Sequence, residues 1–193
     1  MIKPTVLKYQ FSFTATSALI SDFVLIAKAK KNGMKIVPSI LGREKSVTNK
    51  RHLSEFSKRL KSLTSEQLDI LCDGNSEEQK QITHLALCKT YRFYFDFVSD
   101  ILSEKVKTFD MHLTDMDYNS FIRKKEIEHD ELYYLADSTK YKVKQVTMLM
   151  LHQVGIIDSL SNPYILIPDI TIRVKDAIIR DNSTWLRCFL NEI

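Results

Sequence analysis

The chain has 193 residues, of which 44% are hydrophobic and 27% are charged, and its formal net charge is +4. This balance is typical of a folded globular protein and excludes a disordered one. Gly and Pro occur four times each, too rarely for the many turns of a β-sandwich or barrel. We therefore expect an all-α, multi-helical fold.

Cysteines and apolar segments indicate the environment of the protein. Cys72, Cys88 and Cys188 are far apart and show no CxxC spacing, so the sequence predicts neither a zinc site nor a disulfide framework. The first residues lack the features of a secretory signal. The longest apolar segment, ALISDFVLIA, is about half the roughly 20 residues that cross a bilayer. We expect a cytoplasmic protein without membrane contact.

Capping residues and helical periodicity predict elements along the whole chain. A first helix follows Thr14, Thr16 or Ser17 and stops at Asn32 and Gly33. The sequence then predicts a short element at about 36–41, helices at 46–63 and 65–73, and a helical region from 76 to about 107 with a break near Thr90. Further helices are expected at about 117–127, 129–136, 139–154, 169–180 and 184–191.

The acidic loop from Phe109 to Asp117 is the weakest boundary in this pattern. We place a junction there, between a basic N-terminal helical subdomain of residues 1–110 and a C-terminal helical subdomain of residues 111–193. Charge also divides unevenly: residues 1–63 carry a net +10, residues 64–137 a net −8 and residues 138–193 a net +2. Such asymmetry predicts either a polyanionic partner for the basic part or attraction between the two parts.

The stretch SVTNKRHLSEFSKRLKSL, residues 46–63, carries the strongest charge signal. At 100° per residue its leucines and Phe56 form one apolar stripe, and the cations gather opposite, with Glu55 the single acid. Cations on one face bind a phosphate backbone by releasing counterions, although a merely solvated helix also carries lysines. The candidate DNA contacts here are Lys45, Lys50, Arg51, Lys58, Arg59 and Lys61.

Residues 138–168 predict a second site. A helix with an apolar inner face carries Lys140, Tyr141 and Lys144 outward, and after Gly155 the runs IID and YILI predict a small β-hairpin. A helix followed by a hairpin is typical of a winged helix, in which the helix enters the major groove of DNA. The same layout also serves as a protein-interaction module, so both interpretations stay open.

Other chemical signals are weak. Residues 115–126 match calcium-loop spacing, but Ser120 occupies the position that needs Gly, and a capped helix is the simpler interpretation. The histidines are scattered, and the chain lacks a P-loop, a GxGxxG and a GxSxG motif. We therefore expect no enzyme activity, no cofactor, no metal and no small-molecule substrate.

Four segments carry a family resemblance: YQFSFTATSAL at 9–19, TNKRHLSEFSKRLKSL at 48–63, DFVSDIL at 96–102 and LADSTKYKVKQVTMLMLHQVGII at 135–157. The chain resembles the BrxA family of BREX bacteriophage-exclusion systems. The resemblance implies a mostly helical protein that binds DNA beside other BREX proteins, in phage defence and host methylation, without enzymatic activity of its own.

The leading hypothesis from the sequence is a DNA-binding accessory protein that holds duplex mainly through phosphate contacts. Its partners would be double-stranded DNA and other BREX proteins. The alternative is a protein adaptor whose basic helices dock an acidic partner.

Overall fold

A computed structural model describes residues 8–42 and 46–190. Its helices are α1 (Ile20–Lys31), α2 (Ser46–Ser62), α3 (Ser65–Asp73), α4 (Ser76–Thr90), α5 (Arg92–Phe97), α6 (Ser103–Lys107), α7 (Asp115–Glu126), α8 (Asp130–Tyr133), α9 (Asp137–Gln153) and α10 (Ile172–Asn182). Three 3-10 helices, η1 (Ser12–Ala15), η2 (Pro38–Leu41) and η4 (Ser183–Phe189), and a π-helical turn, η3 (Val98–Leu102), complete the fold. The all-helical prediction is confirmed.

Side-chain caps explain the starts of α3, α4, α7 and α10. The Thr64 side chain accepts a hydrogen bond from the Gln67 amide and the Gln67 side chain accepts one from the Thr64 amide, which starts α3. Asn75 and Glu78 form the same reciprocal pair at α4. Such capping boxes satisfy amides that have no partner within the helix.

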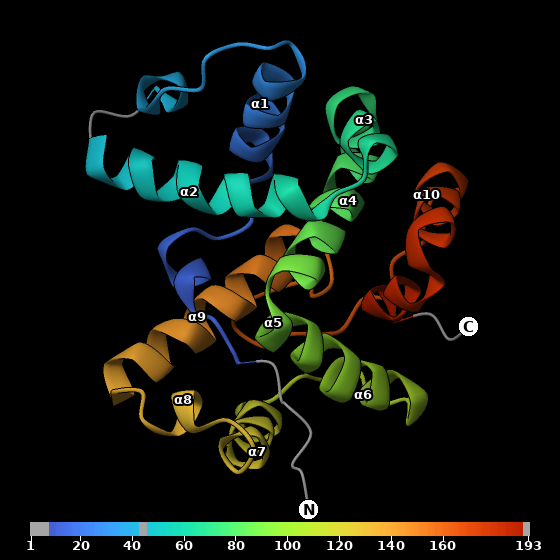
Figure 1. Cartoon of the computed structure of the whole chain (residues 1–193). Coiled ribbons are helices and arrows are strands. Elements are labelled where there is room, and N and C mark those ends of the chain that lie inside the picture. Colours follow the sequence, from blue (N-terminus) through green and yellow to red (C-terminus); the bar gives the residue numbers. More distant parts are fainter. Residues whose placement is uncertain (1–7, 43–45, 191–193) are drawn as a thin grey trace, which may run out of the picture.

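Helices α4, α5 and α6 run in sequence through the middle of the molecule (Figure 1). Helices α1 and α2 pack against α4 on one side, and η1 contacts both α2 and α9. The buried hydrophobic side chains form one cluster that includes Phe23 and Phe56 from the N-terminal part and Val143 and Phe189 from the C-terminal part. The division near residue 110 stays a prediction.

The predicted β-hairpin is not confirmed. In the described part of the chain the IID and YILI runs form no strand. Ile157 makes an isolated antiparallel bridge with Ile165, and His112 makes another with Tyr164. The Ile165 amide donates to the Met111 carbonyl and the Leu113 amide to the Pro163 carbonyl, so a third segment shares the pairing that a hairpin would need. The winged-helix prediction therefore lacks its wing.

Candidate nucleic-acid interface

Helix α2 presents exposed cations over most of its length. Lys50, Arg51 and Lys61 are all exposed, and no carboxylate of a described residue lies within ion-pair distance of them. Lys50 and Lys61 are eleven residues apart, about 16 Å along the helix axis, and differ by about 20° around it. Lys50 and Lys61 therefore lie on the same side of the helix, and Arg51 lies about 100° further round it. We call Lys50, Arg51 and Lys61 the α2 cation row.

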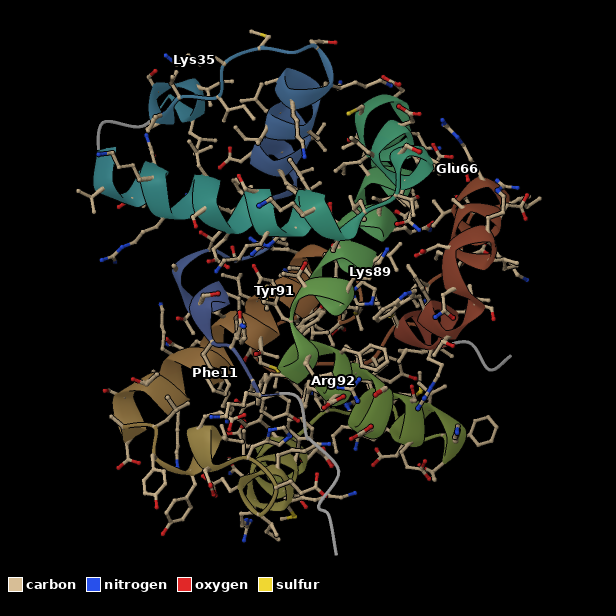
Figure 2. All side chains as sticks on the ribbon, in the orientation of Figure 1. Phe11, Lys35, Glu66, Lys89, Tyr91 and Arg92 are labelled. Carbon is tan, nitrogen blue, oxygen red and sulfur yellow. The ribbon has the colours of Figure 1, made fainter. Side chains whose placement is uncertain are left out.

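Arg59 does not belong to this row, although the sequence predicted it as a DNA contact beside the other cations of the helix. Its side chain is fully buried. Its guanidinium donates to the Ser17 carbonyl oxygen at 2.7 Å, to the Thr16 carbonyl oxygen at 2.6 Å and to the Tyr91 hydroxyl at 3.0 Å. Figure 2 shows Tyr91 beneath α2, where α4 meets α5. Arg59 therefore ties α2 to the N-terminal segment.

Glu55, the single acid of α2, also faces the interior. Its Oε2 accepts hydrogen bonds from the Tyr91 hydroxyl at 2.8 Å and from Ser12 Oγ at 3.0 Å. Burial raises the pKa of the Glu55 carboxyl, but hydrogen bonds from Lys58, Tyr91 and Ser12 outweigh it and hold the pKa below its ordinary value. Its charge is thus used inside the fold.

Lys58 is next to Arg59 in the sequence and pairs with Glu55. Its side chain is 42% exposed, and its ammonium pairs with Glu55 Oε1 at 2.7 Å and donates to Ser12 Oγ at 3.0 Å. The ammonium is therefore already neutralised, unlike those of the α2 cation row. Lys45, the remaining candidate of this region, lies outside the described residues.

The candidate lysines of α9 are paired with α7. Lys140 Nζ lies 2.6 Å from Glu126 Oε1, and Lys144 Nζ lies 2.8 Å from Asp115 Oδ1. Their side chains are only 27% and 23% exposed. Tyr141, the third candidate, is 64% exposed. Helix α9 therefore offers an aromatic ring to solvent but holds two of its charges against the protein's own carboxylates.

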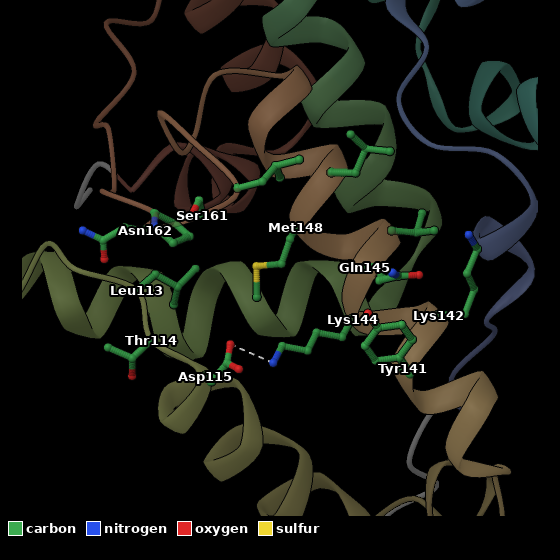
Figure 3. A pocket seen from close by; sticks show the side chains of 14 residues that line it. Leu113, Thr114, Asp115, Tyr141, Lys142, Lys144, Gln145, Met148, Ser161 and Asn162 are labelled. Atoms are coloured by element: carbon green, nitrogen blue, oxygen red, sulfur yellow. Dashed lines mark ion pairs between the residues drawn. The ribbon is translucent and has the colours of Figure 1, made fainter.

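A pocket of about 820 Å³ opens beside this part of α9. Tyr141, Gln145 and Met148 line it from α9, and Leu113 and Asn162 line it from the segments opposite (Figure 3). Its volume lies within the range of about 300–1,000 Å³ that is usual for ligand sites. The structure thus places Tyr141 and Lys144 together at a concave site, at least 80 residues along the chain from the α2 cation row.

The sequence missed two features of this site. Lys142 lines the pocket and is exposed, although helical geometry had selected only its neighbours Lys140 and Lys144. The spacing KYKVKQ, which interleaves cations with an aromatic residue, was the available signal. The opposite wall, with Leu113 and Asn162, had no local signal because it comes from distant segments.

The residues that match calcium-loop spacing, 115–126, form helix α7 with a capped start. Thr114 Oγ1 accepts from the Asp117 amide, and Asp117 Oδ2 accepts from the Thr114 amide at 2.7 Å, which starts α7. Asp117 is also 3.1 Å from Lys105 Nζ. Within residues 8–42 and 46–190, no group of three or more His, Cys, Asp or Glu side chains is arranged to hold a metal ion.

Comparison with known proteins identifies the family. A family model named BrxA matches residues 7–182. The chain belongs to the BrxA family. The curated "BREX protein BrxA" of Bacillus cereus (strain H3081.97) is 32% identical over 97 residues, which are 50% of this chain and 48% of the relative. The match thus spans about half the length of that curated BrxA protein.

A solved structure supports the fold of this BrxA-family chain. The crystal structure of an uncharacterized protein from Magnetospirillum magneticum superposes with a TM-score of 0.81 over 96% of this chain and 99% of that one, at 17% sequence identity. At this identity the likeness concerns the fold alone. None of the described helices has the length and apolar character of a membrane-crossing helix.

Proposed function

We propose that this chain is a non-enzymatic DNA-binding accessory protein of a BREX phage-defence system, acting in the cytoplasm beside other BREX proteins. It holds duplex DNA mainly through phosphate contacts from the α2 cation row. Membership of the BrxA family and the name of the curated relative support the BREX assignment. Phosphate contacts position a protein without reading sequence, so binding has weak sequence preference and strong salt dependence.

One observation carries the proposal: the cations and the acid of α2 point in different directions. Lys50, Arg51 and Lys61 are exposed and unpaired among the described residues, whereas Glu55 is buried against Tyr91. The row is therefore not neutralised by its own helix. A duplex carries about one phosphate charge per 1.7 Å of axis, so a row of about 16 Å meets several phosphates.

The test replaces Lys50, Arg51 and Lys61 together by Glu and measures fluorescence polarisation of a labelled duplex. A matched control reverses Lys124, Lys175 and Arg187, which are exposed on α7, α10 and η4. Both variants change the net charge equally. We expect the first to lose duplex binding and the second to keep most of it, with unchanged circular dichroism spectra. Equal binding by the two variants would contradict the proposal.

The adaptor function is the second candidate. The exposed cations Lys50, Arg51 and Lys61 have no carboxylate partner among the described residues, so an acidic protein could supply carboxylates to the α2 cation row. A complex with such a partner survives nuclease treatment, whereas a complex bridged by DNA does not. Co-purification of BREX proteins with and without nuclease therefore separates the two functions.

A further inference from the structure

The pocket beside α9 has two walls of different chemistry. Helix α9 supplies Tyr141, Gln145 and Met148, and the opposite wall consists of residues 113–115 and 160–163. In Figure 3 Met148 points into the space between the walls, and Leu113 lies across from it. The inner part of the pocket is thus apolar, and its rim carries amide, hydroxyl and ammonium groups.

The opposite wall prevents α9 from entering a major groove. Lys144 Nζ from α9 reaches Asp115 Oδ1 across the opening at 2.8 Å (Figure 3). One lysine side chain and one aspartate therefore bridge the gap between the walls. A recognition helix has to protrude to fill a groove about 12 Å wide, but this face of α9 is recessed. A flat, unpaired base fits such a slot, and a duplex does not.

We propose that this pocket binds an unpaired nucleotide of DNA, with the base between the walls and its phosphate at the rim. This inference rests on the proposed DNA binding and names the ligand of the second site. Tyr141, 64% exposed, offers a ring on which a base stacks, as in single-strand binding proteins. Met148 from the apolar inner part of the pocket contacts the other face of the base, and exposed Lys142 meets the phosphate.

Hydrogen-bonding groups of the rim match a base edge. The side-chain amides of Gln145 and Asn162 both line the pocket, and neither has a hydrogen-bond partner among the described residues. An amide presents a donor and an acceptor together, and an Asn or Gln side chain can bind the edge of adenine through both. The two amides lie on opposite walls (Figure 3), so one base can meet both.

A peptide is the less favoured occupant. Peptides that add to an extended segment need free backbone groups on it. Beside this pocket the Met111 carbonyl already accepts from the Ile165 amide at 2.8 Å, and the Leu113 amide donates to the Pro163 carbonyl at 2.9 Å. The backbone groups of this extended segment are therefore already paired within the fold. Contacts with a ligand have to come from the side chains of the pocket.

The experiment compares a perfect duplex with the same duplex carrying one bulged 2-aminopurine. We expect the wild-type protein to bind the bulged duplex at least fivefold more tightly and to change the 2-aminopurine fluorescence, because stacking on an aromatic side chain strengthens binding by roughly 5- to 150-fold. Tyr141→Ala removes both effects, and Tyr141→Phe, which keeps the ring, restores them. Equal affinity for the two duplexes overturns the inference.

Two further variants test the pocket itself. Met148→Trp fills it, and Asn162→Ala removes a rim amide from an exposed loop, so that one variant stays informative if the other fails to fold. Both should weaken binding of the bulged duplex and leave the perfect duplex unchanged. If both folded variants keep the preference for the bulged duplex, the inference is overturned. A fluorescein-labelled peptide of Asp and Leu tests the alternative. If the wild-type protein binds this peptide, and Met148→Trp abolishes peptide binding but not binding of the bulged duplex, the inference is overturned in favour of a peptide site.

The outcomes separate this inference from the proposed function. If the wild-type protein binds both duplexes equally through the α2 cation row, the pocket inference fails and the proposed function stands. If reversal of Lys50, Arg51 and Lys61 leaves perfect-duplex binding intact while Tyr141→Ala removes the bulge preference, the α2 assignment fails and the pocket inference stands.

Discussion

Helices α2 and α9 carry similar lysine-rich sequences but differ in what surrounds those lysines. On α2 the acid turns inward and the α2 cation row stays unpaired. On α9 the acids come from α7, and Glu126 and Asp115 neutralise Lys140 and Lys144. Availability of a cation is therefore decided by the tertiary neighbours of its helix. This difference is the reason for proposing that α2 supplies the electrostatic binding and that α9 acts through its pocket.

The largest expected effect is on the free energy of unfolding, and it distinguishes Arg59, the buried cation of α2, from the exposed cations of that helix. Arg59→Met removes four hydrogen bonds inside the fold and should lower the free energy of unfolding by about 3 kcal/mol or more, because several buried carbonyl oxygens lose their donor. Lys61→Met should change it by less than about 0.5 kcal/mol. Urea unfolding measures both. An Arg59→Met protein of wild-type stability that fails to bind DNA would return Arg59 to the interface.

The buried side chain of His84 makes the stability of the fold sensitive to acid. Burial lowers the pKa of His84 to about 4, although Nε2 donates to the Cys188 carbonyl oxygen at 2.7 Å and this bond opposes the shift. The folded state thus binds fewer protons than the unfolded state, in which the pKa is near 6.5. Stability is complete above pH 6.5 and falls by up to about 3 kcal/mol as the pH drops to 4.

This pH dependence is measured by urea unfolding between pH 7.5 and 4. His84→Gln should flatten the curve over that range, because glutamine does not titrate. A variant whose stability falls as steeply as that of the wild-type protein would show that other groups cause the acid loss. Binding comparisons between α2 and α9 therefore belong above pH 6.5.

Releasing the α9 lysines by mutation should have a smaller effect. Asp115→Asn together with Glu126→Gln frees Lys140 and Lys144 without moving the backbone, and we expect a severalfold gain in duplex affinity at low salt. The substitutions keep the size of both side chains and leave both lysines able to reach solvent, so the change in stability should be small. The control, Glu128→Gln with Asp130→Asn, alters two exposed carboxylates nearby and changes net charge equally. An equal gain in both variants would mean that net charge alone is responsible.

Sequence patterns predicted the helices well because their starts are local. Thr64 and Gln67 cap α3 from within one turn, and α9 begins and ends within two residues of its predicted range. The positions of Arg59 and Lys144 could not be predicted in this way. Arg59 is buried because Tyr91, 32 residues away, and the N-terminal carbonyls enclose it. Lys144 is paired because α7 lies beside α9.

The predicted hairpin shows the same limit. The IID and YILI runs have strand-forming residues, and Ile157 does meet Ile165. Met111 and Leu113 bond the second run from its other side, and all the pairings stay isolated bridges. Local propensity therefore located the extended segments, but the segment that joins them comes from 50 residues earlier in the chain.

The central claim is that unpaired cations of α2 bind DNA phosphates, and the salt dependence of duplex binding tests it most directly. Affinity is measured from low to moderate salt for the wild-type protein, for the triple variant with Gln at 50, 51 and 61, and for a control with Gln at 124, 175 and 187. We predict that the first variant loses about 3 from the slope of log affinity against log salt, since each phosphate contact contributes about 0.9. A slope that stays at the wild-type value in that variant, or falls equally in the control, contradicts the account.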